Sequence, residues 1–161
     1  MMSRSAGGTQ MSINKSRLYI PALGGLYDSL WDLAWLVLRL AAGLIVVPHG
    51  MQKLFGMFGG GGLSGTAAFF DKIGYSPGSV WAPVLGCIEF FGGLLVAIGL
   101  FTRPAAALLA LQFIFVSHFH LARGFFNPGI EFPLLWLTVF LFFMIRGGGP
   151  MSVDAKMSKE F

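Results

Sequence analysis

The sequence predicts an all-α integral membrane protein: a four-helix bundle with a short amphipathic helix in its first extracytoplasmic loop. Three observations support this fold class. Apolar residues make up 55% of the 161-residue chain and charged residues only 11%, which is unusual for a soluble domain. The charges occur in separated clusters, and the apolar runs between them are long enough to cross a bilayer. Glycine and phenylalanine are both abundant, as suits lipid-facing helices that also pack closely on one another.

The first elements follow from where the apolar runs begin. Residues 1–29 are polar and carry several cations, so we expect a flexible basic tail. The transmembrane domain is expected over residues 30–146, and its first span covers residues 30–48, with two tryptophans as interfacial anchors. A glycine-rich segment follows, in which residues 64–73 have apolar positions at helical spacing behind a candidate N-cap, Ser64. This pattern predicts a short helix on the membrane surface.

The second half of the chain contains three further apolar runs. Residues 80–100 and 104–121 are joined by the short FTRP turn, so these two spans must be antiparallel neighbours. The fourth span, 130–145, is short for a bilayer crossing and ends before a GGGP breaker. Residues 147–161 then form a C-terminal tail. Cys87 is the only cysteine and lies in an apolar run, so an intramolecular disulfide is excluded and a buried apolar role is favoured.

The positive charges predict the orientation. Seven cations fall on the side of the termini and three on the side of the first loop. The first set is Arg4, Lys15, Arg17, Arg103, Arg146, Lys156 and Lys159, and the second is Lys53, Lys72 and Arg123. Because Lys and Arg are enriched on the cytoplasmic side, both termini are expected in the cytoplasm. The spread of these charges over short loops and tails also argues against a nucleic-acid partner.

Three polar residues interrupt the spans near their middles: Arg39, Glu89 and Gln112. A charge at that depth is costly and requires a partner or water. Arg39 shares its helix face with Gly43, and Glu89 shares its face with Gly93, which indicates that both charges point into the bundle. We therefore expect Arg39 and Glu89 to contact each other. The pair could be a functional site, or it could only fix the helix register.

A second polar cluster is predicted at the outward-facing mouth of the bundle. His49 and Lys53 follow the first span there, His120 ends the third, and Glu131 begins the fourth. The convergence of these groups predicts a ligand or substrate site, and the alternative is an ordinary rim of solvated side chains. His118 is two residues from His120, so the two point to nearly opposite sides, and His120 lies nearer the face of Gln112. No metal site is the main expectation, although a site formed by His118, His120 and Glu131 remains an alternative.

Several motifs carry a family resemblance. RLAAGLIVVPHGMQKLFG is followed by GGGGLSGTAAFFDKIG, then by IEFFGGLLVAIGLFTRPAA, HLARGFFNPGIEFPLL and GGGPMSVD. In this order and spacing, over residues 39–154, the chain resembles the DoxX family of small bacterial membrane proteins. The resemblance implies a four-helix inner-membrane protein, similar to the membrane subunit of thiosulfate:quinone oxidoreductase or to members of membrane-associated redox complexes. Polar and glycine positions that match the family pattern are Arg39, His49, Gly50, Lys53, Glu89, Gly92, Gly93, Arg103, His120, Gly124 and Glu131.

Two functions from different classes follow. The first is a quinone-linked or sulfur/thiol redox-associated subunit of the bacterial inner membrane, with quinone as its substrate. Its candidate proton-handling residues are Arg39, Glu89 and His120, and its candidate substrate-binding residues are His49, Lys53, Gln112 and Glu131. The sequence has no haem, iron–sulfur or flavin motif, so electrons would come from a soluble or membrane redox subunit or directly from a substrate.

The second function is a non-enzymatic membrane partner or small-ligand carrier that anchors a soluble redox protein. A homo-oligomer is compatible with either function. An ion channel is the weaker alternative, because four short helices hardly enclose a pore unless they oligomerise.

Overall fold

The computed structural model of the protein describes residues 14–121, 123–126 and 129–157. Residues 1–13 of the predicted tail and the last four residues of the chain lie outside this part. Every regular element within the described residues is helical. Two short 3₁₀ turns, η1 (Lys15–Arg17) and η2 (Pro21–Leu23), precede the first long helix.

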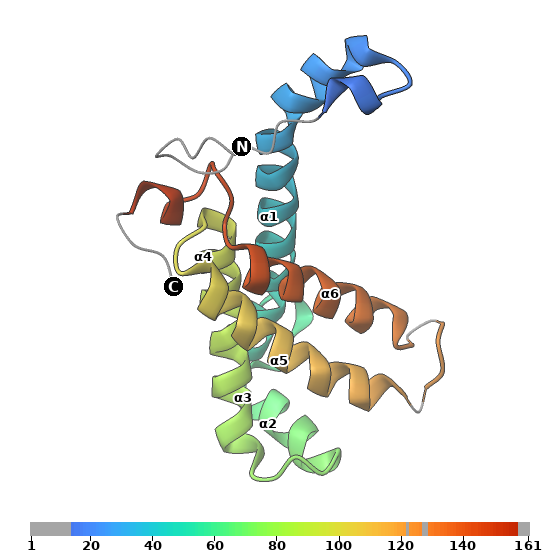
Figure 1. Cartoon of the computed structure of the whole chain (residues 1–161). Coiled ribbons are helices and arrows are strands. Elements are labelled where there is room, and N and C mark those ends of the chain that lie inside the picture. The colour runs from blue at the N-terminus through green and yellow to red at the C-terminus, as the bar shows by residue number, and fades with distance from the viewer. Residues whose placement is uncertain (1–13, 122, 127–128, 158–161) are drawn as a thin grey trace.

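The helix α1 (Gly24–Phe55) is longer at both ends than the span predicted for it. Its 32 residues correspond to about 48 Å, well beyond the roughly 30 Å of a bilayer core. Its N-terminal part extends past the other long helices (Figure 1). At its other end α1 passes through Pro48 and continues over HGMQKLF, which was expected to be a loop. The extension is stabilised by packing, because Gly50 and Leu54 lie against the next span.

The second span is one helical rod in three parts: α3 (Gly78–Cys87), a π-helical turn η4 (Ile88–Gly92) and α4 (Gly93–Ile98). It runs antiparallel to α1 and contacts it along its length. The seam depends on glycine, because a Cβ atom on Gly43 would collide with the backbone of Gly93 and Ala97, and one on Gly50 would collide with Phe90. The small-residue faces predicted from the sequence are therefore the packed faces.

The short helix predicted in the first loop is present as α2 (Gly62–Lys72). It begins two residues before Ser64, and the proposed N-cap is wrong, since Gly61 occupies that position without a side-chain cap. A further 3₁₀ turn, η3 (Met57–Gly59), links it to α1. The helix packs on α3 and α1.

The third and fourth predicted spans are α5 (Thr102–Leu121) and α6 (Glu131–Arg146). They lie side by side as a hairpin that slants away from α1 and α3 (Figure 1). Among the described residues, three helices are long and apolar enough to cross a membrane: Pro21–Phe55, Gly78–Ile98 and Thr102–Leu121. With 16 residues, or about 24 Å, α6 falls short of that length. The four predicted helices are thus present, and three of them have the length and hydropathy of a membrane span.

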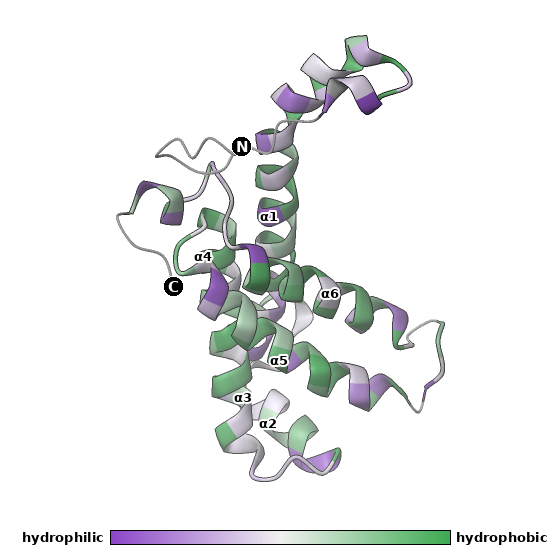
Figure 2. Ribbon diagram, viewed as in Figure 1, coloured by the Kyte–Doolittle hydropathy of each residue, from purple (hydrophilic) through white to green (hydrophobic). Residues whose placement is uncertain are grey.

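The core lies where the two helix pairs meet. Its buried members are Ala42, Val46, Val96, Ala105, Ala106, Leu109, Ala110, Phe140 and Phe143. Large apolar side chains also cover the outside of the helices, such as Val37, Leu44 and Ile114. In Figure 2, α3, α5 and α6 are largely apolar, with polar residues at the helix ends. An apolar exterior around helices that meet closely at small residues is the arrangement expected of a protein in lipid.

Candidate functional site

The predicted contact between Arg39 and Glu89 is wrong. Arg39 donates hydrogen bonds to backbone carbonyls, and Glu89 is bonded to Lys53 and Gln112. The reason is helix register: Gly50 of α1 lies against Phe90, so Glu89 is level with the C-terminal part of α1. Arg39 is about a dozen residues, or about 18 Å, farther along α1. The prediction assumed that the midpoints of the two apolar runs lie at the same depth. This assumption is wrong because α1 extends well beyond the second span.

Arg39 instead belongs to a cluster that we call the C-terminal clamp, formed by Arg39, Thr102 and Asp154. Arg39 is 2% exposed and donates from Nε to the carbonyl of Ala97 (3.2 Å), from Nη2 to that of Met151 (2.9 Å), and from Nη1 to that of Gly148. The guanidinium thereby ties α1, α4 and the segment after α6 together. Its donors are aimed at fixed backbone oxygens, which suits a structural role.

Asp154 completes the clamp from the other side. Its carboxylate accepts hydrogen bonds from Phe101 N (2.7 Å), Thr102 N (2.9 Å) and Thr102 Oγ1 (2.6 Å), at the start of α5. The segment also fits closely, because a Cβ atom on Gly148 would lie 2.7 Å from Thr102 Oγ1. The GGGPMSVD motif lies within the predicted C-terminal tail, yet it is an integral part of the fold.

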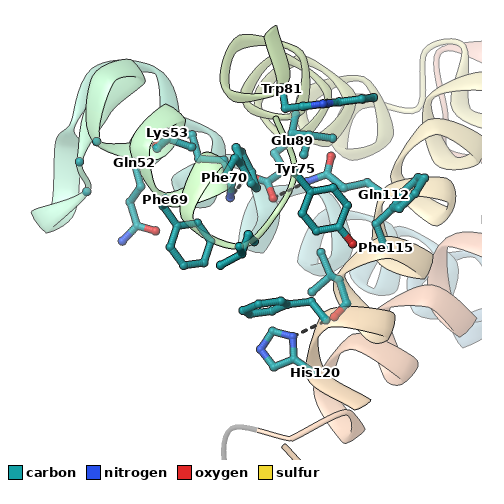
Figure 3. Close-up of a pocket in the computed structure, with 18 of the residues that line it drawn as sticks. Gln52, Lys53, Phe69, Phe70, Tyr75, Trp81, Glu89, Gln112, Phe115 and His120 are labelled. Atoms are coloured by element: carbon teal, nitrogen blue, oxygen red, sulfur yellow. Dashed lines mark hydrogen bonds and ion pairs between the residues drawn. The ribbon is translucent and has the colours of Figure 1, made fainter. Parts of the chain in front are cut away.

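At the opposite end of the bundle, a cavity of about 820 Å³ lies between α1, α2, α3 and α5. Aromatic side chains form a large part of its wall, and Figure 3 shows several of these rings around the space. The aromatic lining residues are Phe69, Phe70, Tyr75, Trp81, Phe115 and Phe119. The volume falls within the range of pockets that hold small organic molecules, about 300–1,000 Å³. None of these rings was predicted as a site residue; for Phe69 and Phe70 the reason is that the apolar face of α2 was interpreted as contacting the membrane surface.

One end of the cavity is polar and is formed by Lys53, Glu89 and Gln112, which we call the polar cluster. Lys53 Nζ lies 2.6 Å from Glu89 Oε2, and Gln112 Nε2 donates to Glu89 Oε1 at 2.6 Å. Glu89 and Gln112 are buried, at 5% and 3% exposure. The three side chains come from α1, η4 and α5, and Glu89 lies on the π-helical turn. Such turns occur frequently at functional sites.

Gln112 has one unsatisfied atom. Its amide oxygen Oε1 is buried and has no hydrogen-bond partner among the described residues. A buried acceptor in that state costs free energy, so each such group requires an explanation.

The predicted mouth is only partly assembled. Lys53 and His120 line the cavity, whereas His49 and Glu131 are not among its lining residues. Glu131 is displaced because it begins α6, which packs on α5 and contributes no lining residue. His118 is exposed, as the helical geometry predicted. His120 Nδ1 lies 2.9 Å from the carbonyl of Val116, so in the neutral ring its Nε2 is an acceptor.

Two further observations describe the mouth. Arg123 lines the cavity, and its Cζ lies 4.6 Å from the centre of the Phe119 ring, a cation–π contact that sequence reasoning missed. Within the described residues, no group of three or more His, Cys, Asp or Glu side chains could hold a metal ion. The alternative metal site at His118, His120 and Glu131 is therefore not assembled.

Comparisons with known proteins place these features in context. The DoxX family model matches residues 34–121. A Bacillus subtilis protein named putative oxidoreductase CatD is 32% identical over 124 residues, covering 77% of this chain and 87% of that protein. An uncharacterized protein of Haemophilus influenzae is 36% identical over 110 residues, or 61% of this chain and 82% of that protein. The Escherichia coli inner membrane protein YqjF is 28% identical over 133 residues, covering 81% and 96%. No solved structure matches the chain.

Proposed function

The chain belongs to the DoxX family of membrane proteins, and we propose that it is a quinone-linked component of a bacterial inner-membrane redox system. The family relationship supports the class in a general way, because one relative is named a putative oxidoreductase and another an inner membrane protein. The observation that carries the proposal is the polar cluster at one end of an aromatic cavity.

The chemistry of a quinone matches this cavity in two respects. Its flat apolar ring stacks on aromatic side chains, and six aromatic residues line the space: Phe69, Phe70, Tyr75, Trp81, Phe115 and Phe119. Its carbonyl oxygens accept hydrogen bonds and gain negative charge during reduction, and Lys53 is a donor positioned at the polar end to stabilise that charge. The cavity volume of about 820 Å³ accommodates the ring together with the first part of an apolar tail.

Proton transfer accompanies the reduction of a quinone, and we assign it to Glu89. A carboxyl group within reach of the ring can give or take a proton there. Lys53 and Gln112 hold Glu89 in place with two short hydrogen bonds. Arg39 has no part in this step, because it belongs to the C-terminal clamp. The electrons come from a redox partner, either a soluble protein or a second membrane subunit.

A ligand carrier that anchors a soluble redox protein is the second candidate, and the same cavity favours it. A carrier binds the small molecule without turnover, whereas a redox component reduces or oxidises the bound quinone when its partner is present. We also propose that both termini are cytoplasmic and that the cavity lies near the outer side, because Lys53 and Arg123 belong to the minority set of cations.

The proposal can be tested with the purified full-length protein in mild detergent. Mass spectrometry of the copurifying small molecules is expected to find a quinone in near-stoichiometric amount. Titration with a short-tailed naphthoquinone should quench the fluorescence of Trp81, which lines the cavity. The Trp81→Phe variant should lose most of that quenching while it still binds the quinone by equilibrium dialysis. If neither copurification nor binding is found, the proposed function is wrong.

A further inference from the structure

The charges that line the cavity do not balance. Among the described lining residues, three side chains carry a full charge at neutral pH: Lys53, Glu89 and Arg123. Lys53 and Glu89 neutralise each other, because Nζ and Oε2 are 2.6 Å apart. No second carboxylate lies in the described part of the wall, so the positive charge of Arg123 has no counterpart in the cavity.

This charge lies at the far end of the cavity from the polar cluster. The lining residues of α5 recur at the spacing of one helix face and form a stripe: Gln112, Phe115, Val116, Phe119 and His120. About 12 Å of helix separates Gln112 from His120. Arg123 follows just beyond the end of α5. The cavity is therefore polar at both ends and apolar between them, and the charge is compensated at one end alone.

Arg123 is held against the wall, and its hydrogen-bond donors stay accessible. Its Cζ lies 4.6 Å from the centre of the Phe119 ring, and this cation–π contact supplies no acceptor oxygen for the N–H groups. The side chain is exposed, so a ligand in the mouth can reach it. Beside it, His120 Nδ1 contacts the carbonyl of Val116, and the charged form of the ring would offer Nε2 as a further donor. The planar fork of a guanidinium matches the two oxygens of a carboxylate.

We propose that the cavity binds an aromatic carboxylic acid in its anionic form, with the carboxylate at Arg123 and the ring among the aromatic side chains. The surplus charge selects one negative charge, the guanidinium selects a carboxylate, and the lining selects the ring. The inference goes beyond the proposed function, because a quinone is uncharged and its carbonyls need the polar cluster rather than Arg123. Both molecules use the same rings, so they compete for the cavity.

The test compares two ligands of one shape that differ in charge. The wild-type protein in a nonionic detergent is titrated by equilibrium dialysis with 2-naphthoate and with its neutral amide, 2-naphthamide. An ion pair at an exposed site predicts an affinity for naphthoate about three- to fivefold above that for naphthamide at low ionic strength. The preference should nearly vanish in about 0.5 M salt, because the mouth is open to solvent.

Variants of two arginines locate the carboxylate. Arg123→Gln removes the charge and should abolish the preference, whereas Arg123→Lys keeps the charge and should retain part of it. Arg146 is the matched control, because its Cζ also lies over an aromatic ring, 6.0 Å from the centre of Trp35, but it does not line the cavity. Arg146→Gln should keep the preference. Comparing the ratio of the two affinities between proteins cancels the partition of each compound into detergent.

Three results would overturn the inference. The first is equal affinity of the wild-type protein for naphthoate and naphthamide at low ionic strength. The second is a preference that survives in Arg123→Gln, and the third is one that Arg146→Gln also loses, because net charge would then attract the acid. Octanoate carries the same carboxylate on a flexible chain. Tighter binding of octanoate than of naphthoate would overturn the assignment of an aromatic acid.

Titration with 1,4-naphthoquinone separates this inference from the proposed function. Displacement of bound naphthoate by naphthoquinone supports both. Binding of naphthoquinone without any preference for naphthoate leaves the proposed function intact and overturns the inference. A preference for naphthoate with no binding of naphthoquinone does the reverse. Simultaneous binding of the two compounds would place the acid outside the space between the rings, and would also overturn the inference.

Discussion

The two ends of the helix bundle each bury charged groups, and they satisfy them in different ways. In the C-terminal clamp, Arg39 and Asp154 bond almost entirely to backbone groups, whose positions and protonation do not change. In the polar cluster, Glu89 bonds only to side chains within the described residues, and a neighbouring acceptor is left without a partner beside a cavity. The difference teaches that burial of a charge does not by itself indicate function. A charge bonded to the main chain fixes the fold, whereas one bonded to ionisable side chains beside a cavity can change its state with a ligand.

The contrast predicts that stability and ligand affinity respond separately to substitutions at the two ends. Substitutions in the clamp should lower stability and leave ligand affinity intact in the molecules that remain folded. Substitutions in the polar cluster should lower ligand affinity and leave stability nearly intact, provided that Lys53 and Glu89 are neutralised together so that no unpaired charge remains.

The largest expected effect is that of Arg39→Met. Removing the guanidinium leaves the carbonyls of Ala97, Gly148 and Met151 without their donor. It also removes the positive charge that interacts with the carboxylate of Asp154. Breaking a buried charged network typically costs about 3–5 kcal/mol. The free energy of unfolding, measured by titrating the detergent-solubilised protein with SDS, should fall by that amount. A loss below about 1 kcal/mol would show that the clamp does not hold the fold together.

The glycine seam between the two ends should give the next largest effect. A methyl group at Gly43 would collide with the backbone of Gly93 and Ala97, so Gly43→Ala must push the helices apart. Overpacking of this kind costs about 1–3 kcal/mol. Gly25→Ala is the matched control on the same helix, since a Cβ atom there meets nothing within 4 Å. Because alanine favours the helical state by up to about 1 kcal/mol, the control should be neutral or slightly stabilising in the same SDS titration.

Within the polar cluster, neutralising Lys53 alone and neutralising both Lys53 and Glu89 should have different effects on stability. Lys53→Met leaves the buried carboxylate of Glu89 without its ion pair, so it should lower both stability and affinity for naphthoquinone. The double variant Lys53→Met/Glu89→Gln should recover most of the stability, because no unpaired charge remains. Its affinity should stay about tenfold below that of the wild-type protein, equivalent to about 1.4 kcal/mol.

Controls for this cycle come from polar residues that do not line the cavity. His118→Ala and Glu131→Gln should bind naphthoquinone as the wild-type protein does. If the double variant regained both stability and affinity, the polar cluster would only fix the helix register. It would then have a structural role, as the clamp has.

Much of the fold could be predicted from the sequence because it depends on local signals. The apolar runs predicted the four long helices, and the helical spacing after the GGGG segment predicted α2. The small-residue faces predicted the helix seam, including Gly43 and Gly93. The same small-residue faces predicted that Arg39 and Glu89 point into the bundle, and both are buried.

What could not be predicted depends on contacts between distant segments. The register of α1 against the second span is set by Gly50 at Phe90 of η4, and no periodicity within either helix contains that information. The pairing of Arg39 with Glu89 was inferred without that register and was wrong. The π-helical turn at Glu89 and the docking of Asp154 on Thr102 likewise require the tertiary structure. The mouth was predicted from helix ends at one level; of its four residues, Lys53 and His120 line the cavity and His49 and Glu131 do not.

The smallest expected effect concerns Asp71, which is the exposed counterpart of Asp154 at the cavity end. Its Oδ1 accepts hydrogen bonds from Gly78 N and Ser76 Oγ, both at 2.8 Å, and these bonds close the corner between α2 and α3. The two donors, led by the backbone N–H of Gly78, hold the pKa of Asp71 below its usual range. The folded corner therefore favours the charged carboxylate. Its contribution is complete above the ordinary pKa of an aspartate, near 4, and is lost as the pH falls through the lowered value.

Asp71→Asn removes this titration and keeps one acceptor oxygen. Hydrogen exchange at the Gly78 amide, followed by mass spectrometry, should accelerate below about pH 4 in the wild-type protein and show no such pH-linked step in the variant. Because the carboxylate is exposed, affinity for naphthoquinone at neutral pH should change by about twofold at most, although α2 supplies part of the cavity wall. The buried Asp154 provides the contrast, since Asp154→Asn places an amide nitrogen against backbone donors and should lower global stability. If Asp71→Asn lowered the global stability as much as Asp154→Asn, burial of the carboxylate would not explain the difference expected between the two residues.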